Sequence, residues 1–384
     1  MKTSRINRRR VALIAAIVCT SAAGLTASSA AAQRGQQRSE SSPAEAELQK
    51  GIGLTRDGKF QEAIPHFLAA RGKVADDFAL SFNLALCYFG VGRHPQAIEL
   101  LNELRSRGRV TADVENLLAL SLLARAKPDE AYAAFERAAR LAPKNEKLYL
   151  YMAEACMDNG YYDLGLKVVA AGLEKMPRSA RLVFERGLLL VKLDHLDEAK
   201  KDLQRVTELA PGSDVAYMAA AQKNLFDGNV AEARRIAREG IDKGQHHFML
   251  LALYGEAALR AGVEPGQPEF TDVRDALEGA VAQRPNYISA RITLGKVYLA
   301  ENRWDDAIAQ LSAARELDAQ NTAVYSNLAS AYRRKGATEQ AEEMLRILAQ
   351  LNAQEVERIR SAPGDRKAGY AERTRPPDKP PPQH

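Results

Sequence analysis

Histidine and cysteine supply many catalytic and metal-binding groups, so their spacing is the first test for chemistry in this sequence. The chain has six histidines, and none forms an H-E-x-x-H pattern or stands at metal-ligand spacing from a cysteine. A phosphate-binding glycine loop and a G-x-S-x-G motif are also absent from the sequence. His246 and His247 are adjacent in a predicted turn, where we interpret them as solvated. The sequence therefore predicts no catalytic residue, no metal and no cofactor, and hence no enzyme.

The elements that must position the side chains recur at a fixed interval. Pro143, Pro177 and Pro211 lie 34 residues apart, and the stretches at 129–145 and 197–213 share one residue pattern. Stepping this interval along the chain defines nine units, of which the seventh is six residues longer than the others. The units are 44–77, 78–111, 112–145, 146–179, 180–213, 214–247, 248–287, 288–321 and 322–355.

Two places in each unit carry small residues. The eighth residue is Gly51, Ala85, Ala119, Ala153, Gly187, Ala221, Gly255, Gly295 or Ala329. Outside the seventh unit, the twentieth is Ala63, Ala97, Ala131, Gly165, Ala199, Ala233, Ala307 or Ala341. The period and this pattern together resemble the tetratricopeptide repeat (TPR), a pair of antiparallel helices. The resemblance implies an all-α fold, a right-handed α-solenoid of about nine tandem helix hairpins.

The residue types explain this spacing. Small residues at the eighth and twentieth places let two helix backbones approach, and larger residues at the fourth and twenty-fourth places, such as Tyr149 and Phe135, fill the remaining space. Glycine costs a helix about 0.5 to 1 kcal/mol relative to alanine, so Gly187 and Gly295 predict places where a methyl group would crowd the partner helix. The proline near the end of a unit predicts the end of its second helix.

The first 32 residues have the composition of a secretory signal peptide. A basic segment, the apolar run VALIAAIVC and small residues follow one another, with an A-x-A-like cleavage site at Ala32. The apolar run is too short to span a membrane, so we expect cleavage, a mature N-terminus at Gln33 and no integral anchor. A lipoprotein attached through Cys19 is the lesser alternative. We therefore expect an exported protein, periplasmic or extracellular.

Signal removal changes the charge. The segment contains five of the basic residues and no acidic one, so the basic and acidic residues of the mature chain are equal in number. A neutral chain has no global field to attract nucleic acid or anionic lipid, and we expect neither as a partner.

The regions outside and between the repeats differ in composition. Residues 33–43 are interpreted as a linker, 356–362 as the end of a C-terminal capping helix, and 363–384 as a disordered proline-rich tail. In the seventh unit, the stretch GVEPGQPEFT at 262–271 predicts an enlarged surface loop between the helices.

Cys87 and Cys156 fall on first helices two units apart, roughly 20 Å from one another, so we expect two buried free thiols.

The remaining chemistry is recognition. The second, fifth, ninth and twelfth residues of each first helix are expected to line the concave surface of the superhelix. On this reasoning the predicted partner groove consists of Phe82, Leu86, Phe89, Leu120, Leu150, Glu154, Phe184, Leu188, Met218 and Gln222. Met157 and Val191 share this face, and Ser326, Ser330 and Arg333 make it polar in the ninth unit. The alternative is that some of these side chains pack against the neighbouring hairpin, but Leu86, Leu120 and Leu188 are expected to stay exposed.

Some proteins of this family hold a C-terminal carboxylate with lysine and asparagine on the same face. Those residues are missing at the matching places, so an acidic-tail receptor is not expected. We predict a non-enzymatic exported scaffold that binds a protein or peptide partner in a partly apolar groove. Two alternatives are open: an auxiliary subunit of a cell-envelope complex for secretion or polysaccharide assembly, and an enzyme whose site no motif reveals.

Overall fold

The computed structural model describes residues 42–75 and 77–361. The predicted signal segment with Cys19, most of the linker and the tail at 363–384 lie outside the described residues. The described chain divides into two units, one up to His246 and one from His247, and we treat each by itself. We call them the N-terminal unit and the C-terminal unit.

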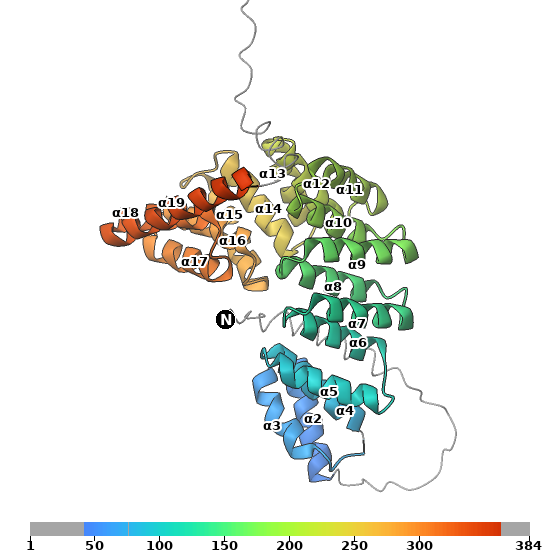
Figure 1. Ribbon diagram of the computed structural model, residues 1–384. Helices are drawn as coiled ribbons and strands as arrows, with labels where there is room; N and C mark the ends of the chain where they lie inside the picture. The colour runs from blue at the N-terminus through green and yellow to red at the C-terminus, as the bar shows by residue number, and fades with distance from the viewer. Residues whose placement is uncertain (1–41, 76, 362–384) are drawn as a thin grey trace, which may run out of the picture. The chain divides into compact units, whose positions relative to one another are not determined.

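Every helix of the described chain belongs to a hairpin (Figure 1). The N-terminal unit contains α2 (Pro43–Arg56), α3 (Phe60–Ala70), α4 (Asp77–Gly90), α5 (His94–Ser106), α6 (Ala112–Leu123), α7 (Pro128–Leu141), α8 (Glu146–Asp158), α9 (Tyr162–Lys175), α10 (Ala180–Lys192), α11 (Leu196–Leu209), α12 (Asp214–Phe226) and α13 (Val230–Asp242). The C-terminal unit contains α14 (Phe248–Arg260), α15 (Pro268–Gln283), α16 (Ile288–Ala300), α17 (Trp304–Leu317), α18 (Thr322–Lys335) and α19 (Thr338–Ser361).

The helix boundaries follow the repeat interval. Each even-numbered helix begins at the first residue of an expected repeat or one residue before it. The structure thereby confirms the predicted fold class, an all-α array of TPR-type hairpins. Pro143, Pro177 and Pro211 each stand two residues after a helix, so they follow the ends of α7, α9 and α11 as predicted.

Small residues at the eighth place let the two helices of a hairpin pack closely against each other. A Cβ atom added to Gly255 would lie 2.5 Å from Leu277 Cγ, and one added to Gly295 would lie 2.7 Å from Leu311 Cγ. Leu311 occupies the twenty-fourth place of its repeat, and Leu277 corresponds to that place once the six extra residues of the seventh repeat are discounted, so small and large residues meet as predicted. The expectation for Gly187 is wrong, because its nearest neighbour, Asp202 Cβ, would be at 3.5 Å, an ordinary contact.

A third place in the repeat has a restricted backbone conformation that the residue pattern did not predict. The fifteenth residue of every repeat, in the turn between its two helices, has a positive φ. Six of the nine are glycine, which adopts this left-handed conformation without strain, and the others are Ala126 (φ 57°), Asp194 (φ 69°) and Asn302 (φ 61°). Mixed residue types at this place hid the rule in the sequence.

The enlarged turn of the seventh repeat is shorter than predicted. Helix α15 begins at Pro268, so the last four residues of the stretch expected to be a loop are helical. Proline is well suited to the first turn of a helix because it has no N–H to leave unpaired there. Phe270, one of these residues, is buried and joins the core of the hairpin.

Cys87 and Cys156 are both buried thiols that are not joined by a disulfide, as predicted. Burial raises the pKa of the Cys156 thiol to about 12, which keeps it in the unreactive protonated form. We therefore assign Cys156 to packing rather than to chemistry.

Candidate functional site

The first helices of the N-terminal unit are neighbours, as a shared recognition face requires. Helix α4 contacts α6, α6 contacts α8, α8 contacts α10 and α10 contacts α12. The ten residues predicted to form the partner groove all lie on these five helices. Their exposure, however, separates them into two sets.

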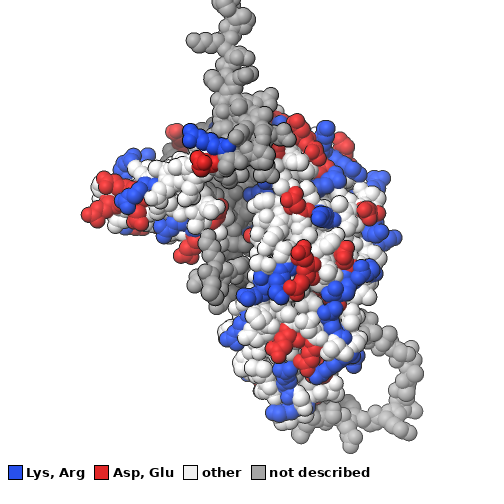
Figure 2. Space-filling view, in the orientation of Figure 1, with Lys and Arg blue, Asp and Glu red and all other residues white. Residues whose placement is uncertain are grey.

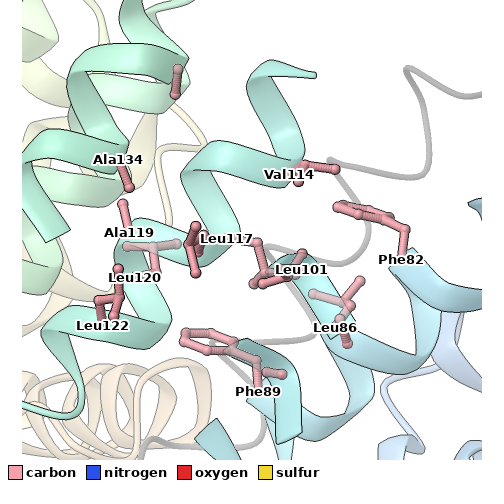
Figure 3. Close-up of a cluster of buried hydrophobic side chains, with 14 of the residues drawn as sticks. Phe82, Leu86, Phe89, Leu101, Val114, Leu117, Ala119, Leu120, Leu122 and Ala134 are labelled. Carbon is pink, nitrogen blue, oxygen red and sulfur yellow. The ribbon is translucent and has the colours of Figure 1, made fainter. Parts of the chain in front are cut away.

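Six of the ten predicted groove residues are buried: Phe82, Leu86, Phe89, Leu120, Phe184 and Met218. Leu86 is 0% exposed and Leu120 is 3% exposed, so the expectation that these two leucines stay exposed is wrong. Figure 3 shows Phe82 turned toward Val114 and Leu86 turned toward Leu101, each reaching a neighbouring helix.

The packing of successive hairpins explains this burial. Helix α6 contacts α4, α5, α7 and α8, and Leu120 at its ninth place is buried among them. The same holds for α4, which contacts α2, α3, α5 and α6. Close-packed interiors leave no room for a ligand beside such side chains. These six residues therefore belong to the core. Helices α8 and α10 have the equivalent four neighbours but keep their ninth places half-buried, so the set of neighbours alone does not fix the exposure.

The other four predicted residues, Leu150, Glu154, Leu188 and Gln222, are half-buried. Met157 and Val191, at the twelfth place of their repeats, are half-buried as well. The six come from the consecutive first helices α8, α10 and α12 and are named here the α8–α12 face: Leu150, Glu154, Met157, Leu188, Val191 and Gln222. Four of the six are apolar, so this face combines hydrophobic contact area with one carboxylate and one amide.

One ionisable group beside the α8–α12 face has a shifted pKa. Tyr151 lies beside Glu154, and burial, followed by the charge of Glu154, raises the pKa of this tyrosine to about 12. The phenol therefore remains protonated at neutral pH and can donate or accept a hydrogen bond. Nothing on this face pairs a nucleophile with a base, and the described residues contain no cluster of three or more His, Cys, Asp or Glu able to hold a metal ion.

The first helices of the C-terminal unit carry a different set of side chains at the same places. The ninth places hold Glu256, Lys296 and Ser330, of which Lys296 is exposed and the other two are half-buried. In α18, Ser326 and Arg333 at the fifth and twelfth places are exposed. The ninth places of the C-terminal unit are thus polar, as are the fifth and twelfth places of α18, which confirms the polar character predicted for the ninth repeat. Ile292, at the fifth place of α16, and Leu259, at the twelfth place of α14, are nevertheless half-buried apolar side chains on this face.

The outer surface is mixed in charge. Figure 2 shows basic and acidic side chains interspersed over the visible face of the N-terminal unit. Among the described residues, no helix is both long enough and apolar enough to cross a membrane.

Family models of the tetratricopeptide repeat match five segments that together cover more than half of the chain: 54–120, 122–183, 180–213, 267–322 and 324–358. The chain is also similar to the TPR repeat-containing protein YpiA of Bacillus subtilis (strain 168), with 24% identity over 181 residues. The match covers 47% of this chain and 41% of YpiA, so the chain spans less than half of that relative.

Two solved structures illustrate the likeness of fold. Yeast Tom70 is 18% identical with a TM-score of 0.51, and the match covers 92% of this chain and 71% of Tom70. YrrB, described as a TPR protein with an unusual peptide-binding site, is 21% identical with a TM-score of 0.34, and the match covers 48% of this chain and 91% of YrrB. Similarity at this level concerns the fold alone.

Proposed function

The chain belongs to the tetratricopeptide repeat family, and from this premise we propose that it is an exported, non-enzymatic scaffold that binds a protein or peptide partner on the α8–α12 face. Interaction with other proteins is the general role of the family's fold. The finer parts of the proposal, which are the location of the site and the export of the chain, rest on the sequence and on the exposure of particular residues.

One observation carries the location of the site. Four apolar side chains, Leu150, Met157, Leu188 and Val191, retain solvent exposure on adjacent helices while their counterparts on α4 and α6 are buried. Apolar side chains gathered on a surface and bordered by polar groups are typical of binding sites. Glu154 and Gln222 add a carboxylate and an amide that can fix the orientation of a bound chain through directional hydrogen bonds.

Export is supported by the composition of the first 32 residues alone. We propose cleavage after Ala32, which gives a mature chain that begins at Gln33 and meets its partner in the periplasm or outside the cell. N-terminal sequencing of protein recovered from the envelope and medium tests this proposal. A chain that retains Met1, or one that is lipidated at Cys19, would contradict it.

The binding proposal is tested with Leu188→Glu in the mature chain. A charge on the α8–α12 face would be desolvated without a counterion when the partner binds, so we expect affinity to fall about tenfold or more. The partner is first identified by crosslinking the mature chain in the envelope fraction, and affinity is then measured with the purified partner by calorimetry.

The matched control is Ser330→Glu, which places the same charge at the ninth place of α18, outside the proposed site. We expect this variant to bind like the unmodified chain. Circular dichroism melts on both variants separate a loss of binding from a loss of fold. Equal affinity of the Leu188→Glu variant and the unmodified chain for the partner would rule out this face as the site.

A further inference from the structure

A second surface feature, outside the six residues of the α8–α12 face, is a shallow pocket between α11 and α12. Its volume is about 480 Å³, and it is lined by Lys200, Lys201, Gln204, Arg205, Glu208 and Lys223. The two helices contact one another, so the wall of the pocket is built by packed elements rather than by a loose loop. We name it the α11–α12 pocket.

The sequence of α11 places five of these side chains on one stripe of the helix. Residues 200, 201, 204, 205 and 208 are separated by one, three, one and three positions, a spacing that keeps them on neighbouring lines of one helical face. Lys201, Gln204, Arg205 and Glu208 are exposed, and Lys200 and Lys223 are half-buried. Figure 2 shows basic side chains gathered where Figure 1 places α11.

The charges of the pocket are only partly balanced. Lys200 Nζ lies 2.7 Å from one oxygen of Asp227, and Lys223 Nζ lies 2.9 Å from the other. Hydrogen bonds from these two lysines hold the pKa of the Asp227 carboxyl below its usual range. One carboxylate thus serves two ammonium groups, which leaves one positive charge uncompensated.

Two further cations add to this excess. The guanidinium of Arg205 donates through Nη2 to the carbonyl oxygen of Pro177 at 3.0 Å, a neutral acceptor that leaves its charge in place. Lys201 is exposed and makes no ion pair with any described carboxylate. Glu208 accepts a hydrogen bond from Gln204 at 3.3 Å and is the acidic group among the lining residues.

We propose that the α11–α12 pocket binds an acidic segment of a partner protein, a short run of Asp or Glu residues. Lysine and arginine pair with carboxylates through charge-assisted hydrogen bonds, and the arginine fork can hold one carboxylate through two of them. From Lys200 to Glu208 the stripe extends about 12 Å at 1.5 Å per helical residue, which matches about four residues of an extended peptide.

A peptide fits this surface better than a nucleic acid does. Binding to a phosphate backbone requires a basic stripe or patch that follows the polymer. The visible face of the N-terminal unit instead intersperses acidic side chains among the basic ones, so the excess of positive charge is local. A local excess suits a ligand of a few carboxylates.

The proposal is tested by fluorescence anisotropy with a fluorescein-labelled octaglutamate peptide and the mature chain. The double variant Lys201→Glu/Arg205→Glu should bind the peptide about tenfold more weakly or worse, because two attractive charges become repulsive. The charge-preserving double variant Lys201→Arg/Arg205→Lys should lose less affinity than the charge-reversed variant, because it keeps both positive charges and gives up only the arginine fork of Arg205. For the unmodified chain, affinity should fall as salt is raised.

A matched control reverses two exposed basic residues of the same unit at the end of α7 and in the turn after it, Arg140→Glu/Lys144→Glu. We expect its affinity for the peptide to stay within about twofold of that of the unmodified chain. An equal loss in the control, or no binding by the unmodified chain at low salt, would refute the pocket. Oligothymidylate and phosphatidylserine vesicles, titrated in parallel, should bind more weakly than the peptide; binding as tight as the peptide's would refute the choice of ligand.

This inference is separable from the proposed function. Leu188→Glu should leave octaglutamate binding unchanged while it weakens binding of the partner on the α8–α12 face. Conversely, the Lys201→Glu/Arg205→Glu variant should keep the wild-type melting temperature, since exposed side chains are changed. Loss of peptide binding in Leu188→Glu would show that the two surfaces form one site and would overturn the separate pocket.

Discussion

Helices α6 and α18 occupy the same place in their repeats, but their surroundings differ. Helix α6 contacts α4, α5, α7 and α8, whereas α18 contacts α16, α17 and α19 and belongs to the last hairpin of the described residues. Every residue from Val114 to Leu123 is buried in α6, and in α18 only Val324, Tyr325, Leu328, Ala329 and Ala331 are buried. A helix with hairpins on both sides can therefore bury a whole stretch that α18 leaves partly exposed. Two flanking hairpins do not by themselves make the ninth place part of the core, because α8 and α10 also have them and their ninth places are half-buried.

The ninth place offers the largest test of this comparison. Leu120→Ala removes buried methyl groups from α6 and should lower the free energy of unfolding by about 2 to 5 kcal/mol. Ser330→Ala at the same place in α18 should change it by less than about 0.5 kcal/mol. Urea unfolding followed by circular dichroism measures both values. Similar losses for the two variants would contradict the assignment of the ninth place to core in α6 and to surface in α18.

Ion pairs provide the next contrast. Glu115 in α6 is 1% exposed and accepts hydrogen bonds from Arg105 Nε at 2.8 Å and Arg137 Nε at 2.9 Å. Glu115→Ala leaves both guanidinium groups without their counterion and should cost about 2 to 4 kcal/mol. The exposed pair of Lys335 and Asp305 beside α18 is the control, and Asp305→Ala should cost less than about 1 kcal/mol. Chemical denaturation of the two variants decides whether burial sets the difference.

Acid should weaken the region around α6 more than the last hairpin. His94, at the start of α5, is buried, and its ring nitrogens lack hydrogen-bond partners among the described residues. Burial, and secondly the charge of Arg125, lowers the pKa of His94 to about 4 from 6.5. The unfolded chain therefore binds the proton more readily than the folded chain between these pH values. Stability should be complete above pH 6.5 and fall as the pH drops toward 4, by at most about 3 kcal/mol.

The measurement is the free energy of unfolding at several pH values for the unmodified chain and for His94→Gln. The variant should lose part of the pH dependence in this window, because the proton-binding group is gone. His195→Gln, which changes an exposed histidine, should keep the full dependence. If His94→Gln and the unmodified chain lose stability in parallel, His94 is not responsible.

The smallest expected effects concern the turns that follow the two helices. Ala126 after α6 and Gly336 after α18 occupy the same fifteenth place, with φ of 57° and 82°. Ala126→Gly should relieve left-handed strain and raise stability by about 0.5 to 1 kcal/mol, whereas Gly336→Ala should lower it by about 1 kcal/mol. Thermal melts of the pair measure both signs. A loss of stability in Ala126→Gly would show that the strain is compensated by packing of the methyl group.

The architecture could be predicted from the sequence because the residue pattern of each repeat reflects contacts between residues that are close together in the chain. The interval from Pro143 to Pro177 is the length of one hairpin. The glycines opposite Leu277 and Leu311 likewise mark contacts between the two helices of one hairpin. The fate of Leu86 and Leu120 was not predictable, since burial there depends on the next hairpin and its exact approach. The charge excess of the α11–α12 pocket was hidden for the same reason, because Asp227 lies in a different repeat from Lys200.

The range of the helix contacts also bears on how this chain acquires its structure. Every substantial contact between described helices joins elements one or two places apart along the chain. Proteins built from such local contacts lose little loop-closure entropy and fold quickly, in microseconds to milliseconds for small domains. A hairpin can therefore reach its native contacts as soon as its neighbour is present. Within each unit, folding can therefore start at the N-terminal hairpin before the C-terminal hairpins are present.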